Sequence, residues 1–306
     1  MTSRNSNGPG GLPPRTGLSG LTSARPIAPA QAAAGGGREF AFTAADFERI
    51  KKMIHDHAGI VLSPTKQDMV YGRLARRLRE KRIATFGEYL DQLPRDRFEW
   101  EAFVNALTTN LTSFFREAHH FQILADRLRK IGNDHPIQIW CSAASTGEEP
   151  YSIAITACEA FNTLNPPVKI VASDINTKVI GEARAGIYTS DRINGLTPSH
   201  LQKYFLRGVP GDPGGYRVRP ELQRLISFCS LNLLEPNWSV RGPFDAIFCR
   251  NVMIYFDKNT QYGILKRFVP MLREDGALFA GHSESFLHAA ELFKPMGRTV
   301  YQRARI

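Results

Sequence analysis

A run of small residues between an apolar strand and a helix is the part of this chain best suited to holding a ligand. The run lies within residues 140–153, WCSAASTGEEPYSI. In open α/β sheets such a corner lets a ligand approach the backbone at the carboxyl end of the strand. Here it carries two carboxylates, Glu148 and Glu149, which would repel a pyrophosphate but suit a ligand with a cationic end. The corner therefore points away from NAD or ATP and toward S-adenosylmethionine.

Asp174 is a second candidate contact, because it directly follows a strand expected at 168–173. A carboxylate in this place can accept hydrogen bonds from ribose hydroxyls. A lone aspartate after a strand can equally cap the next helix, so both interpretations stand. Its position about 30 residues after the small-residue loop favours the ribose.

The elements that position these residues alternate between strand and helix from residue 136 onward, which predicts a parallel sheet. Strands are expected at 137–141, 168–173, 244–249 and 277–280. The alternation breaks over 194–228. There a helix is followed by the turn-rich GVPGDPGG and by β-like residues at 216–219 and 225–229. We interpret this stretch as a small β insertion.

A helical region precedes the sheet. Thr43 and Asp46 open its first helix, which ends near Gly59, and further helices are expected at 66–82, 86–93 and 98–107. Within the helix expected at 66–82, residues 73–82 hold six basic residues against one acid, Glu80. The basic residues are Arg73, Arg76, Arg77, Arg79, Lys81 and Arg82. Such a run is ordinarily a solvated face, but its imbalance also suits a docking surface.

Composition narrows the class of protein. The chain has 306 residues, 42% of them hydrophobic, and a net charge of +10, so it can bury a full core and bind an acidic partner. Residues 1–37 hold eight Gly, five Pro and no acid, and are expected to form a disordered tail. The absence of a signal segment or membrane-spanning run favours a cytoplasmic protein. Neither the four isolated cysteines nor the histidines have metal-ligand spacing, so no metal is expected.

Six motifs in a fixed order carry a family resemblance. They are TTNLTSFFRE (108–117), SAASTGEEPYSIA (142–154), ASDIN (172–176), NLL (232–234), FDAIFCRNVMIYFD (244–257) and GHSES (281–285). Over roughly residues 40–302 the chain resembles the chemotaxis receptor methyltransferases, the CheR family. The resemblance implies an S-adenosylmethionine-dependent enzyme that methylates glutamate side chains of bacterial chemoreceptors. It also implies that the enzyme is cytoplasmic and is recruited to receptor arrays at the membrane.

The resemblance also implies the fold, an α/β protein with a doubly wound, Rossmann-like methyltransferase domain. A small all-α domain precedes it, and a small antiparallel β-subdomain is inserted in it. The expected boundaries are a tail at 1–37, a helical domain with its linker at 38–117, and a methyltransferase domain at 118–306 whose insertion spans about 194–228.

Carried over motif by motif, the family's cofactor contacts fall on nine residues. They are Asn110, Thr112, Arg116, Glu149, Asp174, Asn232, Leu233, Arg250 and Asn251. Asp174 suits the ribose, and Glu149 can meet the amino-acid end of the cofactor or orient the loop. Asn232 can contact the adenine edge, and Asn251 the methionyl backbone. On the sequence alone, without the family resemblance, Asn110 and Thr112 could equally be helix caps.

The implied reaction needs little acid–base chemistry, because a glutamate with an unperturbed pKa of about 4.3 is already ionised at neutral pH. The expected catalytic residues are Arg116, which would hold the incoming carboxylate, and Tyr255, which would line the methyl group. An aromatic at Tyr255 is otherwise ordinary core. Arg73, Arg76, Arg77 and Arg79 are expected to dock the glutamate-rich helical bundle of the receptor.

Other partners and functions are open to a protein of this kind. In some family members the β-subdomain binds a receptor's C-terminal peptide by adding a strand. Nucleic-acid methylation is disfavoured, because the NPPV at 165–168 lacks a stacking aromatic and precedes the second strand. A receptor-binding module with a silent site remains an alternative. We expect a monomer that neither binds nucleic acid nor inserts into a membrane.

Overall fold

The computed structural model describes residues 38–209 and 211–304. The predicted disordered tail, 1–37, lies outside these residues. The chain divides into two compact units, 1–39 and 40–306, and the second unit carries all the helices and strands described below.

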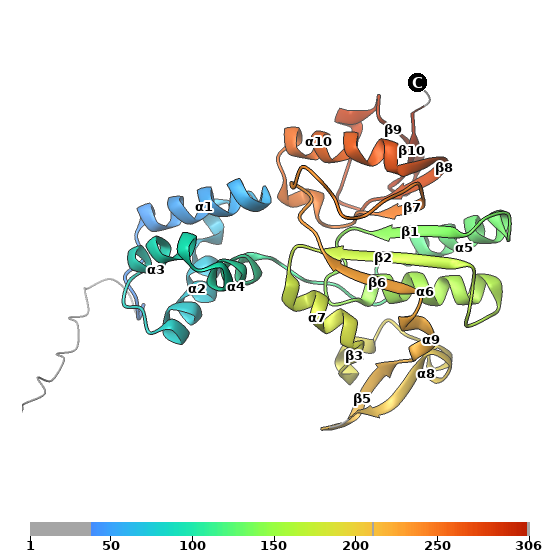
Figure 1. Ribbon diagram of the computed structural model, residues 1–306, viewed down its shortest axis with the longest axis horizontal. Coiled ribbons are helices and arrows are strands. Elements are labelled where there is room, and N and C mark those ends of the chain that lie inside the picture. The colour runs from blue at the N-terminus through green and yellow to red at the C-terminus, as the bar shows by residue number, and fades with distance from the viewer. Residues whose placement is uncertain (1–37, 210, 305–306) are drawn as a thin grey trace, which may run out of the picture. The chain divides into compact units, whose positions relative to one another are not determined.

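The first part of this second unit is helical (Figure 1). It contains α1 (Ala44–Ala58), α2 (Gln67–Lys81), α3 (Phe86–Gln92), α4 (Arg97–Leu107) and the 3-10 turns η1 (Pro64–Lys66) and η2 (Leu93–Arg95). As predicted, the Thr43 side chain caps α1 by accepting a hydrogen bond from the Asp46 backbone N–H, and Gly59 ends the helix with φ 68°. The apolar faces of the helices meet in one core around Ile50 and Leu74.

The described residues also form a seven-stranded sheet in the order β6-β2-β1-β7-β8-β10-β9. Its strands are β1 (Ile137–Cys141), β2 (Val168–Asp174), β6 (Ile226–Ser230), β7 (Phe244–Phe248), β8 (Leu272–Phe279), β9 (Phe293–Gly297) and β10 (Val300–Arg303). β6, β2, β1, β7 and β8 run parallel to one another, whereas β10 runs antiparallel to β8 and β9. Because β1 lies between β2 and β7, the chain winds outward from it in two directions. The sheet is doubly wound, as predicted, and the β1–β7 boundary is where such sheets bind ligands.

Helices cover both faces of this sheet. α5 (His119–Ile131) and α6 (Glu148–Phe161) contribute to the core on one face, together with Ile139 of β1. α10 (Lys258–Phe268) packs on the other face, where the ring centroid of Phe268 lies 5.3 Å from that of Trp140. Neighbouring residues of β1 therefore serve opposite cores, as the alternation of a strand requires. The remaining elements of this sheet's connections are α7 (Thr177–Ala185), α9 (Pro220–Gln223), η4 (Met253–Tyr255), η5 (Val269–Met271) and η6 (Leu287–Ala289).

A second, smaller sheet lies between β2 and β6 in the sequence. In the described residues it has three antiparallel strands in the order β3-β5-β4, namely β3 (Ile187–Tyr188), β4 (Phe205–Val209) and β5 (Asp212–Val218). η3 (Ser190–Ile193) and α8 (Pro198–Tyr204) connect β3 to β4. The predicted small antiparallel sheet is therefore present.

The prediction was wrong about one strand of this insertion. Residues 225–229 were expected to belong to it, but Ile226–Ser230 is β6 and pairs in parallel with β2, Ile170 opposite Ile226. The strands of the small sheet span 187–218 instead. The error has a physical reason, because a parallel strand finds its partner through a long crossover and carries no local signal of where it pairs.

The predicted strand bounds, the cysteines and the helix lengths can each be set beside the structure. The strand predicted at 137–141 matches β1, those at 168–173 and 244–249 differ by one residue from β2 and β7, and 277–280 covers only the end of β8. The four cysteines, all within the described residues, are free thiols, and only Cys229 is not fully buried. None of the helices in the described part of the chain is both long and apolar enough to cross a bilayer.

Candidate active site

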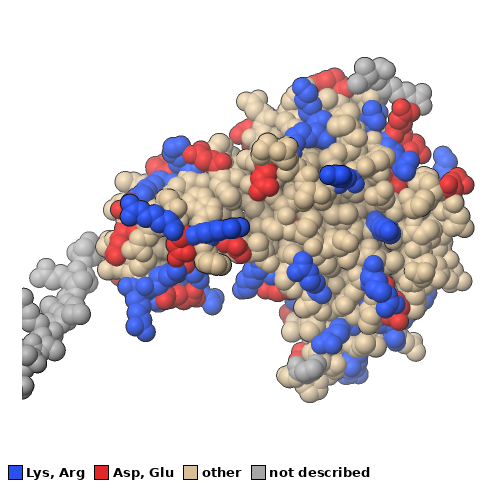
Figure 2. Space-filling view, viewed as in Figure 1, with Lys and Arg blue, Asp and Glu red and all other residues tan. Residues whose placement is uncertain are grey.

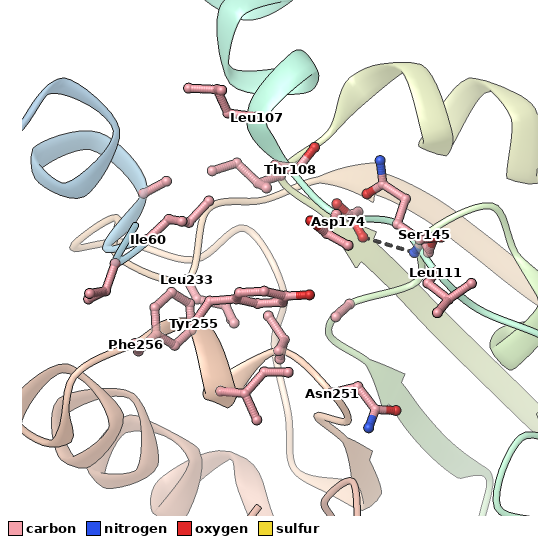
Figure 3. Close-up of a pocket in the computed structure, with 18 of the residues that line it drawn as sticks. Ile60, Leu107, Thr108, Leu111, Ser145, Asp174, Leu233, Asn251, Tyr255 and Phe256 are labelled. Atoms are coloured by element: carbon pink, nitrogen blue, oxygen red, sulfur yellow. Dashed lines mark hydrogen bonds between the residues drawn. The ribbon is translucent and has the colours of Figure 1, made fainter. Parts of the chain in front are cut away.

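A cavity of about 670 Å³ opens at the carboxyl ends of β1, β2 and β7 (Figure 3). It is bounded on another side by the α1–α2 connection and by the linker between α4 and α5. Every residue predicted to contact the cofactor lines it, and so does Tyr255. These residues are Asn110, Thr112, Arg116, Glu149, Asp174, Asn232, Leu233, Arg250, Asn251 and Tyr255.

The small-residue loop after β1 folds tightly against the strands. The Ala144 N–H donates to the Ser173 carbonyl at 2.9 Å, and Gly147 ends the loop with φ 100°. A Cβ at Gly147 would lie 2.7 Å from the Tyr188 hydroxyl and 3.0 Å from the Cβ of Ala183. Only glycine fits this corner, because both the φ and the space exclude a side chain.

Asp174 closes the loop from the neighbouring strand. Its carboxylate accepts hydrogen bonds from the backbone N–H of Ser145 at 2.8 Å and of Asn176 at 2.9 Å, the first of which is drawn in Figure 3. The cap of α7 is Asn176, whose side chain accepts from the Lys178 and Val179 N–H groups. Asp174 is therefore not the helix cap, and it lines the cavity while burial raises the pKa of its carboxyl.

The two carboxylates of the loop point to different places. Glu149 lines the cavity and forms an ion pair with Arg250, whose Nη1 lies 2.6 Å from Oε2. Glu148 does not line the cavity; it is buried and pairs with Arg192, which follows β3. Of the two carboxylates expected to face the ligand, only Glu149 lines the cavity.

Arg250 also contacts Glu117, a residue outside the predicted set. Nη2 of Arg250 lies 3.2 Å from Oε2 of Glu117. The buried guanidinium of Arg250 is therefore flanked by two carboxylates, Glu117 and Glu149. Burial opposes the ionisation of Glu117, but the hydrogen bond with His282 and the charge of Arg250 bring its pKa down to about 2. Its position directly after Arg116 in the FFRE motif was the available signal.

Asn251 is held in the left-handed region, φ 56°, by a second carboxylate outside the predicted set. Glu284 accepts hydrogen bonds from the backbone N–H groups of Asn251 and Val252, each at 2.9 Å, and of Met253 at 2.7 Å. It belongs to the GHSES motif. Its role is to shape the turn after β7, from which Asn251 and Tyr255 reach the cavity.

The side chain of Asn232 joins the turn after β6 to the helical domain. Its amide N–H donates to the His57 carbonyl at 2.7 Å, and its oxygen accepts from the Leu234 N–H at 3.0 Å. Arg267 of α10 steadies the same turn by donating to the Leu233 carbonyl at 3.2 Å. Asn232 and the apolar Leu233 both line the cavity at this wall.

The linker between α4 and α5 supplies the opposite wall. α4 ends with Thr108 as its cap residue, and the residue before α5 is Ala118, so neither Asn110 nor Thr112 caps a helix. The Asn110 carbonyl accepts from the Ser145 hydroxyl at 2.9 Å, which ties the linker to the small-residue loop. Arg116 is half-buried, and its Nη1 donates to the Leu111 carbonyl at 2.9 Å.

Tyr255 is not core. It ends η4, is half-buried, and its ring extends into the cavity in Figure 3. Its carbonyl accepts from the Val61 N–H at 2.9 Å, which fixes the α1–α2 connection beside it. The cavity thus combines an acidic strand-end residue, a tight glycine corner, apolar walls and an arginine. Its volume is within the range of small-ligand sites, and these residues fit S-adenosylmethionine.

Comparison with known proteins decides the family. The family model described as "CheR methyltransferase, SAM binding domain" matches residues 110–302, and "CheR methyltransferase, all-alpha domain" matches 45–108. The chain belongs to the CheR methyltransferase family. It is an S-adenosylmethionine-dependent methyltransferase of the chemotaxis type, and its all-α domain precedes the methyltransferase domain as expected.

Named relatives agree with this assignment. The "Chemotaxis protein methyltransferase" of Escherichia coli (strain K12) is 53% identical over 263 residues, which cover 85% of this chain and 91% of the relative. "Chemotaxis protein methyltransferase 2" of Pseudomonas aeruginosa is 51% identical, over 88% of this chain and 96% of the relative. A solved glycopeptide N-methyltransferase with sinefungin aligns over 64% of this chain and 61% of that chain, with 9% identity and a TM-score of 0.34.

In this methyltransferase, two of the four arginines expected to dock a receptor are engaged within the helical domain. Arg73 lines the cavity and donates to the three carbonyls of residues 106–108 at 2.8–3.3 Å. Arg77 forms a two-point ion pair with buried Glu99, at 2.9 and 2.6 Å, and the Tyr89 hydroxyl donates to the same carboxylate. Both arginines hold α2 against α4.

The other two arginines face solvent. The Arg76 side chain is 76% exposed and pairs with Glu80 at 3.0 Å, and Arg79 is also exposed. On the face shown in Figure 2, acidic side chains are interspersed with the basic ones over the helical domain. The charge on this surface is thus less one-sided than the run of basic residues indicates.

No metal site was expected, yet the described residues contain one group with suitable ligand atoms. Glu117, His119 and His120 place such atoms within 4.8 Å of one another. Arg250 lies 3.2 Å from Glu117, and its positive charge disfavours a cation at this point.

Proposed function

We propose that this enzyme transfers a methyl group from S-adenosylmethionine to glutamate side-chain carboxylates of bacterial chemoreceptors, on the helical bundle at their cytoplasmic end. The products would be glutamate methyl esters and S-adenosylhomocysteine. The proposal rests on one observation above all. Arg116 and Tyr255, which suit a carboxylate acceptor, line the same cavity as the predicted cofactor contacts. The names of the chemotaxis relatives support it.

S-adenosylmethionine supplies a methyl group on a positively charged sulfur, which a carboxylate oxygen can attack without a general base. The enzyme's residues then have three tasks: to bind, to orient and to exclude water. Arg116 would hold the incoming carboxylate, and the Tyr255 hydroxyl would orient one of its oxygens. Orientation of this kind contributes roughly 7–11 kcal/mol to well-positioned reactions.

The residues of the cavity divide between the two substrates. We assign Asp174 to the ribose hydroxyls and Leu233 to the face of the adenine. Asn251 and the Glu149–Arg250 pair would then meet the amino-acid end, whose ammonium and carboxylate groups find a partner of each sign there. Asn110 and Thr112, which lie on the linker, would contact the cofactor from the opposite side of the cavity.

For receptor docking we propose the exposed arginines of α2, Arg76 and Arg79, with Arg73 and Arg77 as structural support. The small sheet offers a second contact, because β4 lies at the edge of its described strands and could accept an extended receptor peptide as a further strand.

The test uses purified enzyme, methyl-labelled S-adenosylmethionine and a glutamate-rich cytoplasmic receptor fragment from the same cell. Mild alkali releases methanol from carboxyl methyl esters but not from methylated amines or bases. Alkali-labile label on the fragment is the expected result. Alkali-stable label would contradict the glutamate assignment, and bound cofactor without any transfer would favour a silent receptor-binding module.

A further inference from the structure

Large apolar side chains are exposed around the mouth of the active-site cavity. Leu111 is 81% exposed, Val61 52% and Ile254 50%, and all three line the cavity. Exposed apolar side chains gathered at a site mark a surface that a partner covers. They come from three separate segments, the linker, the α1–α2 connection and η4.

Each of these residues is linked, by a hydrogen bond to its backbone or by its place in the chain, to a residue that we assign to the methyl acceptor. Arg116 donates to the Leu111 carbonyl at 2.9 Å. Val61 donates from its backbone to the Tyr255 carbonyl at 2.9 Å, and Ile254 precedes Tyr255 in the chain. In Figure 3, Leu111 lies on the opposite side of the view from Phe256, with the Tyr255 ring between them. Exposed apolar residues are therefore linked to both of the residues that would hold the carboxylate.

We propose that this rim, Val61, Leu111 and Ile254, binds apolar side chains of the substrate helix one turn before and one turn after the methylated glutamate. On a helix, residues three and four positions away lie on the same face, about 5–6 Å from the central one. The rim thus selects glutamates by their neighbours, whereas a purely electrostatic site would accept any exposed glutamate. This inference rests on the proposed function and specifies its substrate.

The experiment compares two constrained helical peptides, each with one glutamate. One has alanine, leucine or valine three and four positions away on both sides, and the other has serine or glutamine there. We expect wild-type enzyme to methylate the first with a kcat/KM at least about tenfold higher. Leu111→Ser and Ile254→Ser should remove most of that preference, while their dissociation constants for S-adenosylmethionine stay within about twofold of wild type.

The matched control is Phe98→Ser, since Phe98 is 86% exposed on α4 and does not line the cavity. It should keep the full preference. Equal rates on both peptides, or rim variants that weaken cofactor binding and leave the preference intact, would overturn the inference while leaving glutamate methylation standing. If wild type methylates neither peptide nor the receptor fragment, the proposed function fails as well.

Discussion

Arg250 joins three segments that are far apart in the sequence, because its guanidinium lies between Glu117 of the linker and Glu149 of α6. A buried charge is stable only when it is paired and hydrogen-bonded. Together, Arg250, Glu117 and Glu149 carry a net negative charge. Such a group suits a cavity whose ligand carries a positive sulfur.

The depressed pKa of Glu117 predicts how stability depends on pH. Because its pKa is about 2 in the folded protein and 4.5 without such partners, ionised Glu117 stabilises the fold. We expect Glu117→Gln to lower the free energy of unfolding by about 3 kcal/mol near neutral pH. The difference should be complete above pH 4.5 and should shrink as the pH falls toward 2, as measured by urea denaturation. Asp126→Asn, which breaks an exposed pair with Arg129, should cost under about 1 kcal/mol.

The assigned acceptor residues predict a separation of kinetic effects. Arg116→Lys and Tyr255→Phe should each lower turnover on receptor fragment by about 10²-fold, because both variants misplace the carboxylate. Binding of S-adenosylmethionine, measured by calorimetry, should change little. Weak cofactor binding in either variant, with turnover at saturation preserved, would show that the residue supports the cofactor instead.

Asn232 shows where residue-level inference from sequence ends. The NLL motif places it at the cavity, but its amide bonds to the His57 carbonyl, 175 residues away. Glu284 was missed for the same reason, since its partners are backbone N–H groups of residues 251–253. Motifs identify which residues reach a site, whereas the partner of a side chain depends on segments brought together by folding.

At the scale of elements, the β1–α6 connection depends on one glycine. Gly147→Ala would force a Cβ to 2.7 Å from the Tyr188 hydroxyl at a φ of 100°. We expect a loss of about 2 kcal/mol or more in the free energy of unfolding and weaker cofactor binding, because the loop must move off the sheet. Gly263→Ala in α10 is the control. Its Cβ meets no atom within 4 Å, so it should be neutral or stabilising by up to about 1 kcal/mol. Equal effects of the two substitutions would contradict this account.

Elements with local signals were predicted well. α1 carries its capping box and its terminal glycine in the sequence, and β1 is a short apolar run before a glycine turn. β6 was assigned to the wrong sheet because the small sheet separates it from β2, its partner. β9 and β10 were not predicted at all. The antiparallel pairing of β10 with β8 and β9 is set by tertiary contacts and not by a turn signal such as Asn-Gly.

At the scale of the whole molecule, charge and apolar contact make different predictions for receptor binding. The net charge of +10 and the exposed arginines of α2 should attract a glutamate-rich bundle. We expect the KM for receptor fragment to rise severalfold between about 50 and 500 mM salt, because the screening length falls below 8 Å. Arg76→Gln should raise KM at low salt and flatten this dependence. Arg95→Gln, another exposed arginine, serves as the control. A KM independent of salt in wild type would exclude electrostatic docking by α2.

The cavity is walled on one side by the helical domain and on the other by the large sheet. Direct hydrogen bonds cross between these walls, among them Asn232 to the His57 carbonyl, Val61 to the Tyr255 carbonyl and Asn176 to the Thr108 hydroxyl. A molecule lodged between the walls touches both, so its binding free energy also opposes their separation. At a hundred times its dissociation constant, such a ligand adds about 2.7 kcal/mol. The two domains should therefore separate at a higher temperature in a cell rich in S-adenosylmethionine than in a cell depleted of it. The enzyme would then be most resistant to heat when its cofactor is abundant.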